Sequence, residues 1–400
     1  MSVISQEKLT VQPRVSKIQN SLKNEFNNII EGTGKIVVID FIVGFLMMFL
    51  GVAVLGMPLG TFVVLVYVAF KTFSKPKYDI RQINLFIAIT LISLLCVTLT
   101  SLASDYSSTD QILRRLIRIV GILMFALYIG DRRIDLRSLL LGLSTAMVIN
   151  AIAFYAGIAP DTYGGYLTGW IADKNVAGLY HAIVPLLMFV LFSKRWQRLF
   201  IVALALPLLW ETGSRTSIGG FIIAIGWMLF AGKVNLFFKI LLGGLVMWAF
   251  EWMQNQFASS AVFGDRTGTD WFRAQIDAAS WEKVQNTPWH GMGLGQAVAQ
   301  LTETRQVFFH NSYWTLFVEG GWPWTIGILG LTFLTVFVWK QPQQPQFSRK
   351  IGAEAAMVLL AICSWRLGEV MLTVCWAFAM GLALTYLASP RQTSQSDKWK

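Results

Sequence analysis

One short segment of the chain combines side chains that can do chemistry with residues that interrupt helices. It reads FFHNSYWTLFVEGGWPW over residues 308–324 and contains His310, one of only three histidines in 400 residues. Histidine is the side chain best suited to act as a general base near neutral pH. The alternative interpretation is structural: a buried, hydrogen-bonded histidine, or an interfacial residue in an aromatic belt.

The residues after His310 predict a short helix with a defined end. On a helix, His310, Trp314 and Phe317 share one face. Gly320-Gly321 would end that helix, and Pro323 would lie in the first turn of the next one. We therefore expect His310 at the outer end of a short helix that lies on a membrane surface.

A second segment, GSRTS, presents Arg215 in a sharp turn beside small hydroxyl residues. The planar guanidinium of arginine matches phosphate oxygens with two parallel hydrogen bonds. Ser214, Thr216 and Ser217 would add hydrogen-bond donors, and Ser217 could cap the next helix. The segment therefore indicates a site for an anionic group.

Other ionisable residues fall at membrane depth, where charges usually face a polar cavity or a partner. Arg366 and Glu369 lie in SWRLGEV and are spaced to pair with each other on one helix. Arg114, Arg115 and Arg118 cluster at a predicted helix end. Arginines there can extend to lipid phosphates, which is the structural interpretation.

Composition indicates how these residues are held. The chain is 55% hydrophobic and 14% charged, with a mean hydropathy of +0.55, whereas soluble domains carry about 25% charged residues. Its apolar runs do not alternate like barrel strands. We expect an all-α polytopic membrane protein with about twelve transmembrane helices of roughly 20 residues each. The predicted spans are 36–55, 58–71, 83–102, 116–130, 138–158, 176–192, 199–211, 217–232, 238–254, 322–339, 352–366 and 370–388.

The basic residues predict an orientation. With a cytoplasmic N-terminus, most of the 33 Lys and Arg residues fall in short cytoplasmic loops, as the positive-inside rule requires. Both termini are then cytoplasmic. We divide the chain into a cytoplasmic segment 1–35, a transmembrane domain 36–388 and a cytoplasmic tail 389–400. The long loop 255–321, with short surface helices, lies outside. The outside basic residues are Arg114, Arg115, Arg118, Lys174, Arg215, Arg266, Arg273, Lys283, Arg305 and Arg366.

Several classes of function are disfavoured. The net charge of +11 is scattered between apolar runs, so we expect membrane lipids and no nucleic acid as partners. The three cysteines lie in apolar runs without metal or disulfide spacing. HGMGLG lacks the strand and helix of a dinucleotide loop, which favours a turn after Pro288. We find no metal or nucleotide motif, and expect no metal and no cofactor.

Taken together, these segments resemble the O-antigen ligase and polymerase superfamily of integral membrane proteins. The resemblance covers about 160–385. It rests on the order of DKNVAG at 173–178, Arg215, Arg273 before Pro288, His310-Asn311, Glu319-Gly320-Gly321 and Glu369. One position departs from the pattern: Trp324 stands where members often have glycine, which weakens any assignment to a subgroup.

The resemblance implies a reaction. A glycan carried on undecaprenyl diphosphate would move to a hydroxyl of a lipid or glycan acceptor, on the periplasmic face of the bacterial inner membrane. In this scheme Arg215 and Arg273 stabilise the leaving diphosphate, in the role that metals play elsewhere. His310 is the general base. Asn311 orients the imidazole or binds sugar hydroxyls.

The resemblance also implies a set of substrate-binding residues. Glu319 and Glu369 are expected in orienting roles. The full set is Asn311, Lys174, Asn175, Arg305, Glu319, Arg366 and Glu369. Aromatic side chains of the long loop could stack on sugar rings, or could equally form an interfacial belt. These are Trp271, Trp281, Trp289 and Trp314.

Two alternatives to a surface-polysaccharide ligase stay open. A polymerase of the same superfamily shares these motifs and would extend the lipid-linked chain. A secondary transporter fits the number of spans, but transporters tend to show repeats and broken helices at the midplane. Here the polar residues gather on the outer face. Two superposable halves would favour the transporter.

Overall fold

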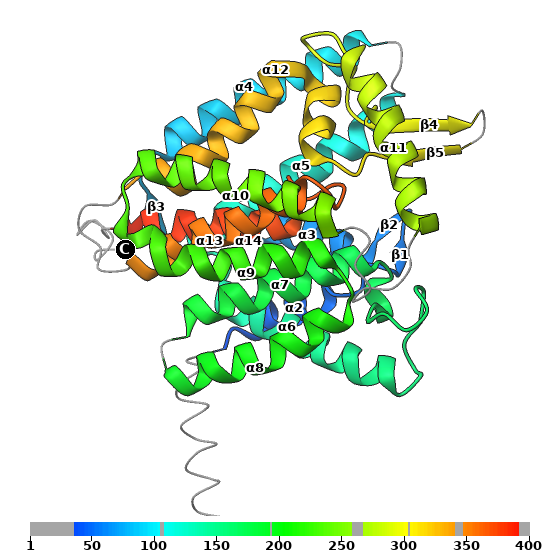
Figure 1. The fold of residues 1–400 in the computed structure, drawn as a ribbon. Helices are drawn as coiled ribbons and strands as arrows, with labels where there is room; N and C mark the ends of the chain where they lie inside the picture. Colours follow the sequence, from blue (N-terminus) through cyan, green and yellow to red (C-terminus); the bar gives the residue numbers. More distant parts are fainter. Residues whose placement is uncertain are drawn as a thin grey trace, which may run out of the picture.

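The computed structural model describes residues 36–104, 108–192, 194–257, 267–302, 305–340 and 347–391. The predicted segment 1–35, Arg266 and all but the first residues of the tail 389–400 lie outside these ranges. Within them the chain is mostly helical, which agrees with the predicted class (Figure 1).

Thirteen α-helices are described. They are α2 (Val38–Leu46), α3 (Leu59–Thr72), α4 (Ile83–Ala103), α5 (Thr109–Gly130), α6 (Leu136–Tyr155), α7 (Lys174–Leu191), α8 (Arg195–Glu211), α9 (Arg215–Phe230), α10 (Leu236–Phe257), α11 (Thr267–Gln285), α12 (Ser312–Phe333), α13 (Phe347–Ser364) and α14 (Val374–Leu387). Two 3₁₀ turns, η1 (Gly169–Ile171) and η2 (Ala231–Lys233), and a π-helical end to α12, η4 (Leu334–Val338), complete them.

The structure also contains short strands, which the all-α prediction did not include. They form three antiparallel pairs within the described residues. The pairs are β1 (Ala53–Val54) with β2 (Met57–Pro58), β3 (Tyr78–Ile80) with β6 (Ala388–Pro390), and β4 (Val298–Thr302) with β5 (Arg305–Phe308). The pair β4–β5 lies in the predicted long loop, which therefore holds α11 and a hairpin as well as the start of α12.

Five described helical segments are long and apolar enough to cross a membrane. They are Ile83–Ala103, Leu136–Tyr155, Lys174–Leu191, Arg215–Lys233 and Ser312–Val338, with shorter apolar helices at Leu59–Thr72, Leu236–Ala249 and Val374–Leu387. These lengths match the roughly 20 residues that a bilayer requires. These helices support the prediction of a helical membrane protein. The number of twelve spans and the orientation stay predictions.

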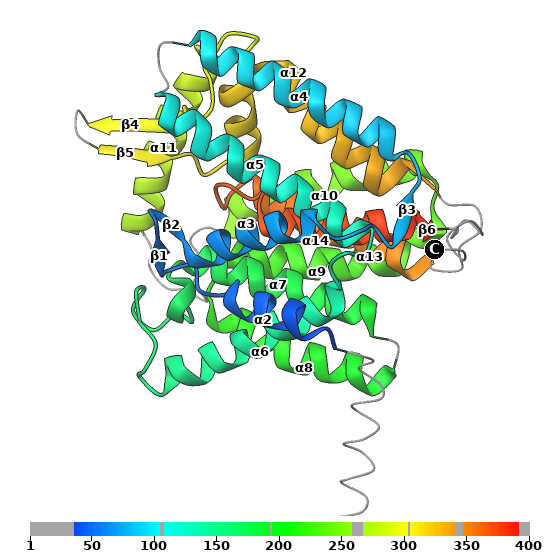
Figure 2. The same ribbon diagram turned by 180° about the vertical axis from the view of Figure 1, so that it is seen from behind.

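The helices lie side by side, and the strand pairs lie at the two ends of the bundle. Figures 1 and 2 place β1–β2, β4–β5 and α11 at one end, and β3–β6 at the opposite end. Helix α14 lies in the middle, and every one of its residues is buried. A helix that is apolar on all sides is stable only when other elements cover it.

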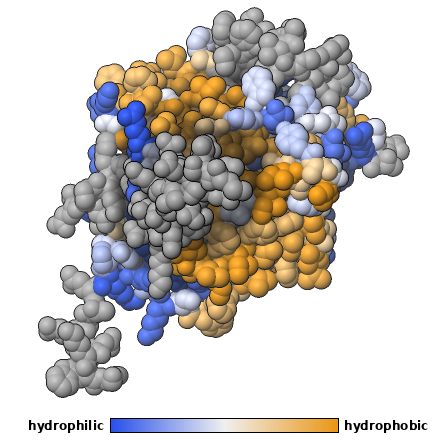
Figure 3. All heavy atoms as spheres, turned by 90° about the horizontal axis from the view of Figure 1, so that it is seen from below, coloured by the Kyte–Doolittle hydropathy of each residue, from blue (hydrophilic) through white to orange (hydrophobic). Residues whose placement is uncertain are grey.

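The outer surface of the bundle is also apolar. Along α4, Leu91, Ile92, Leu95, Leu99 and Leu102 are each more than half exposed. Figure 3 shows a broad apolar area on one face, with hydrophilic residues gathered towards its margins. Contiguous exposed apolar surface of this extent is expected to face lipid.

The predicted span 36–55 is helical only in its first half, because α2 ends at Leu46. Helices α2 and α6 touch through glycines: a Cβ on Gly44 would lie 1.9 Å from the Leu139 carbonyl oxygen. Beyond α2, irregular backbone finds protein partners, including a hydrogen bond from the Gly51 amide to the Trp170 carbonyl at 2.8 Å. Irregular backbone is tolerated at membrane depth only when it is satisfied in this way.

A small second core holds the outer elements together. Ile276 of α11 and Phe309, the residue before His310, belong to one buried cluster with Ala297, Ala299 and Val318. Burial of these side chains fixes α11 against the β4–β5 hairpin and the start of α12. The cluster therefore determines which face of α11 lies towards His310.

Candidate functional site

His310 lies immediately before α12, and its neighbour begins that helix. Asn311 is the N-cap: its carboxamide oxygen accepts hydrogen bonds from the amides of Tyr313 and Trp314 at 2.9 and 3.2 Å. Such a cap satisfies backbone donors that a helix start leaves free. Asn311 is buried. Because the two capping bonds occupy its carboxamide oxygen, only its amide nitrogen can make the predicted contact with imidazole or sugar.

A turn from far along the chain docks on the same residues. The Gly368 amide donates to the His310 carbonyl at 2.9 Å. The Ser312 hydroxyl donates to the Gly368 carbonyl and accepts from the Val370 amide at 2.8 Å. The segment between α13 and α14 thus holds the backbone of His310 in place. Arg366 and Glu369 lie in this segment, after the end of α13 at Ser364 and before the start of α14 at Val374. The expectation that they share one helix is therefore wrong.

The His310 side chain is half-buried and carries an open hydrogen-bonding position. Its Nδ1 is buried, and no described residue bonds to it. Burial lowers the pKa of His310, and the positive charge of Arg273 lowers it further, while Asp277 and Asp173 act in the opposite direction. The imidazole is therefore held neutral at neutral pH, which is the form that can accept a proton.

Helix α11 supplies a cation and an anion to this site. Arg273 and Asp277 are four residues apart and share one face of the helix. Both are close enough for their charges to act on His310. Asp277 also pairs with Arg366, whose Nη1 lies 3.3 Å from the carboxylate. Arg366 thus contacts α11, and the pairing with Glu369 that the sequence suggested is not formed.

The loop between α6 and α7 forms another side of the site. The Tyr163 hydroxyl donates to the Asp173 carboxylate at 2.8 Å. Burial raises the pKa of Tyr163 to about 12 and Asp173 adds to the rise, while Arg273 opposes it. Because Arg273 acts on Tyr163 as well as on His310, the loop, α11 and the start of α12 converge on one guanidinium.

Asp173 also begins α7 and places two predicted residues. Its second carboxylate oxygen caps the amides of Asn175 and Val176 at 2.8 and 2.9 Å. The Lys174 ammonium lies over the ring of Tyr166, 4.7 Å from its centre. Asp173 therefore sets the start of the helix that carries Lys174 and Asn175. It was not predicted as a site residue, although it precedes them in DKNVAG.

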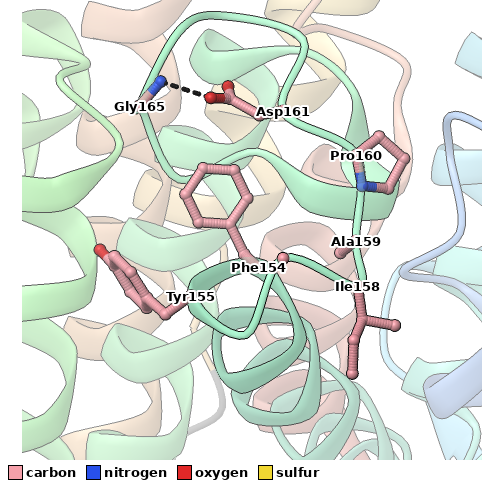
Figure 4. A pocket seen from close by; sticks show the side chains of 8 residues that line it. Phe154, Tyr155, Ile158, Ala159, Pro160, Asp161 and Gly165 are labelled. Carbon is pink, nitrogen blue, oxygen red and sulfur yellow. Dashed lines mark hydrogen bonds between the residues drawn. The ribbon is translucent and has the colours of Figure 1, made fainter.

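The same loop carries a shallow pocket, drawn in Figure 4. Its walls come from the end of α6 and the loop, and include the rings of Phe154 and Tyr155 and the loop residue Pro160. Asp161 folds the loop: its carboxylate accepts from the Gly165 amide at 2.7 Å. The pocket thus offers aromatic surface and a carboxylate on the loop that bears Tyr163.

Arg215 is the first residue of α9 and lies at the same end of the bundle. The turn before it packs on the Tyr166 ring, since a Cβ on Gly213 would lie 2.3 Å from that ring. The Ser214 and Ser217 hydroxyls are 2.9 Å apart and bond to each other. Arg215 is partly buried. Tyr166 therefore links the turn of Arg215 to Lys174.

Glu319 and Glu369 form a separate charged cluster with two arginines. Two nitrogens of Arg115 lie 2.9 Å from the two carboxylate oxygens of Glu319. A third lies 2.5 Å from Glu369, which also accepts from Arg118 at 2.9 Å. This corrects the reading of Arg115 and Arg118 as lipid-facing residues. Both glutamates are thus paired with arginines, whereas the resemblance implied that they orient the substrate.

The Gly320-Gly321 pair breaks α12, as the sequence predicted. Gly321 has φ +62° and ψ −158°, which only glycine adopts readily. The segment after Pro288 wraps around this break, with the Met292 and Gly293 amides bonded to the Val318 and Glu319 carbonyls at 2.7 and 3.0 Å. HGMGLG is therefore a backbone support for the kink. Trp324, at the position that departs from the family pattern, is fully buried beneath it.

Arg305 and the aromatic residues lie further out. Arg305 is exposed on β5, with its guanidinium 4.6 Å from the centre of the Phe272 ring. Trp281 and Trp314 pack against each other with ring centres 5.4 Å apart. Trp271 and Trp289 are exposed. No described contact joins Arg305 to His310.

Sequence reasoning missed Asp277, Tyr163 and Tyr166. Asp277 carried a usable signal, because it follows Arg273 by one helical turn. Tyr163 and Tyr166 carried none, since only the folded loop brings them to Asp173 and Lys174. No protein-family model matches this chain, and no curated protein matches it.

Proposed function

We propose that this chain is a membrane glycosyltransferase that moves a glycan from undecaprenyl diphosphate to an acceptor hydroxyl, acting as a surface-polysaccharide ligase of the O-antigen ligase type. One observation carries the proposal. His310 is half-buried, its Nδ1 has no bonding partner among the described residues, and its pKa is lowered beside the guanidinium of Arg273. A neutral base beside a cation is the pairing that this transfer requires.

The proposed step balances as a single displacement. The acceptor hydroxyl gives its proton to the His310 imidazole while its oxygen bonds to the anomeric carbon of the glycan. The bond from that carbon to the diphosphate oxygen breaks, and its electron pair leaves with undecaprenyl diphosphate. The growing negative charge is stabilised by Arg273 and Arg215, because charged donors act strongly where water is excluded.

Two further cations, Arg366 and Lys174, lie beside acidic residues of the site. Asp277 holds Arg366 at 3.3 Å. Asp173 holds Tyr163 and the first turn of α7. Arg366 is thus held by Asp277, and the Lys174 ammonium lies over the Tyr166 ring. In this proposal both add positive charge for the diphosphate or the acceptor. In this scheme Glu319 and Glu369 position the kink of α12 through Arg115 and do not touch substrate.

The glycan needs a broad, weakly polar surface. The packed rings of Trp281 and Trp314 and the pocket beside Phe154 lie on the elements that surround His310. Sugar rings stack on aromatic faces and bond to carboxylates. The proposal therefore assigns the sugar chain to this outer end of the bundle.

We further propose that the chain crosses the bacterial inner membrane about twelve times, with both termini cytoplasmic and the His310 site periplasmic. The charge at the other end of the bundle supports this orientation. Lys71 bonds to the Arg133 carbonyl at 2.8 Å, and Arg391 lies 3.7 Å from Asp79 beside the β3–β6 pair. Basic residues gathered at that end are typical of the cytoplasmic side.

Deleting the gene and examining the surface glycan tests the function. Loss of a ligase leaves polymer on the lipid carrier, without attachment to its acceptor. Loss of a polymerase leaves a single repeat unit attached, which would replace the ligase assignment by that of the related enzyme. A surface glycan unchanged in amount and length would overturn the proposal. Complementation with wild-type protein should restore the glycan, and complementation with His310→Gln should not.

A further inference from the structure

A cavity of about 530 Å³ lies between α6, α7 and α8, away from the His310 site. Figure 1 shows these three helices together on one side of the bundle. Apolar side chains form most of its wall. They include Phe192, Trp196, Phe200, Leu204 and Ile149.

One side of this cavity opens to the apolar surface of the bundle. Phe200 of α8 is 62% exposed, and Trp196, Leu204 and Ile149 are exposed beside it. A molecule in the cavity would therefore touch the surrounding lipid without passing through water. Such an opening suits a hydrocarbon chain.

The cavity has a polar mouth at one end. Gln197, in the first turn of α8, lines it and is only 5% exposed. Its side-chain oxygen is buried, and no described residue bonds to it. Buried polar atoms are nearly always hydrogen-bonded in folded proteins. The atom therefore points to a ligand group that can donate.

Basic residues surround the same mouth. The Arg137 guanidinium lies 4.7 Å from the centre of the Phe192 ring, and Arg198 donates to the Phe192 carbonyl at 2.7 Å. Lys194, the N-cap of α8, and Arg195, its first residue, are exposed. The acidic group that acts on Arg137 is Asp135. The rim therefore carries a clear excess of positive charge.

This mouth lies far from the candidate active site. Helix α7 begins at Lys174, beside Asp173 and Tyr163, and ends at Leu191, beside the mouth. Its 18 residues span about 27 Å at 1.5 Å per residue, close to the thickness of a bilayer core. A molecule whose charged end lies on Arg195 cannot present that end to His310.

We propose that this cavity binds an anionic phospholipid, with one acyl chain between α6, α7 and α8 and its phosphate on the rim of Arg137, Lys194, Arg195 and Arg198. A hydroxylated headgroup, as in phosphatidylglycerol, donates to the Gln197 oxygen. Positive charge next to an apolar groove matches the two halves of such a lipid. The inference stands on residues separate from the His310 site and does not depend on the proposed function.

Native mass spectrometry of the full-length protein, with added phosphatidylglycerol or phosphatidylethanolamine of equal chain length, tests the proposal. Phosphatidylglycerol should bind more tightly. Arg195→Gln should weaken its binding about fivefold, the effect of one basic residue on an anionic lipid. It should weaken phosphatidylethanolamine binding less, because the ammonium of that lipid offsets the charge of its phosphate.

Two variants of α8 test the place of the acyl chain. Leu204 lines the cavity, whereas Leu206 is exposed on the same helix and does not line it. Leu204→Trp should weaken phosphatidylglycerol binding by partly filling the cavity, and Leu206→Trp should not. Equal effects of the two variants, equal binding of the two lipids, or preferred binding of a polyprenyl phosphate that depends on Leu204 would each overturn the proposal.

Discussion

Arg115 of α5 forms a buried ion pair with Glu319 of α12: its Nη2 donates to one carboxylate oxygen at 2.9 Å, and its Nε lies 2.9 Å from the other. Glu319 is 2% exposed and also accepts from the Gly295 amide at 3.0 Å. The pair ties three segments together directly beside the break of α12 at Gly320. His310 and its cap Asn311 begin the short helix that ends there, so the pair fixes the element that carries His310.

Arg115→Lys should destabilise the protein, because one ammonium cannot replace a planar guanidinium that bonds to both Glu319 and Glu369. Removing one partner of a buried pair typically costs about 3–5 kcal/mol, and lysine should lose a large part of that. The melting temperature in detergent measures the effect. Arg114→Lys is the matched control: Arg114 and Asp110 are 62% and 68% exposed, and such pairs contribute about 0–1 kcal/mol. Equal melting temperatures for the two variants would contradict the role of Arg115.

Single cysteines test the proposed orientation. Gln306 is exposed on β5, and Lys75 is exposed at the opposite end of the bundle. In a Cys96→Ser background, Gln306→Cys should react with an impermeant thiol reagent on intact spheroplasts. Lys75→Cys should react only after permeabilisation. The two remaining cysteines, Cys363 and Cys375, are buried. The reverse labelling pattern would place His310 in the cytoplasm and rule out the proposed periplasmic reaction.

Arg273 and Arg215 should not be replaceable by lysine. Lysine keeps the charge but loses the planar fork that matches a diphosphate. Loss of one charge-assisted hydrogen bond should lower turnover about 10- to 100-fold. Initial transfer rates with purified protein measure this. Arg81→Lys, at the opposite end where Arg81 bonds to the Lys340 carbonyl, should keep full activity. Full activity of Arg273→Lys would show that a point charge is sufficient.

The transfer rate should depend on pH through His310. Its pKa lies below the ordinary value of 6.5 because of burial and Arg273, so the neutral base persists to lower pH than usual. The rate should fall only as pH drops through this lowered pKa. Asp277→Asn removes a carboxylate that raises the pKa of His310 and frees Arg366, so the acid limb should move to still lower pH. An acid limb above 6.5, or one that Asp277→Asn moves upward, would contradict this geometry.

The same shift has a consequence for stability. The folded-state pKa of His310 is below the unfolded value, so the unfolded chain binds the proton more readily as pH falls. The group therefore destabilises the fold as pH drops through about 6.5 towards the folded pKa, and has no such effect at higher pH. Melting temperatures at both ends of this range should show a smaller acid-induced loss in His310→Gln than in wild type. An equal loss would show that His310 does not titrate in this range.

The sequence predicted the helical class and the break at Gly320-Gly321 because both follow from local properties. Apolar length determines the first, and paired glycines before Pro323 determine the second. The helix predicted over 36–55 is shorter than expected, because its backbone packs on α6 up to Leu46 and the Gly51 amide then bonds to the Trp170 carbonyl. Tertiary contacts, which no local pattern records, set that boundary.

The site was predictable only in part for the same reason. His310, Arg273, Lys174 and Arg366 could be selected as unusual residue types at an outer end. Their partners could not. Arg366 and Glu369 are three residues apart, yet one pairs with Asp277 and the other with Arg115. The turn between α13 and α14 decides this, because it points the two side chains to different neighbours.

The central claim is that the His310 imidazole takes the proton from the acceptor hydroxyl, and turnover of His310→Gln by purified protein, measured beside its melting temperature, tests it most directly. Glutamine keeps hydrogen bonding but cannot accept the proton, so turnover should fall about 10²- to 10⁴-fold while the melting temperature near neutral pH stays close to wild type. His290→Gln is the control: His290 is exposed in the same outer region, and its replacement should leave turnover unchanged. A His310→Gln protein that is both stable and fully active would contradict the account.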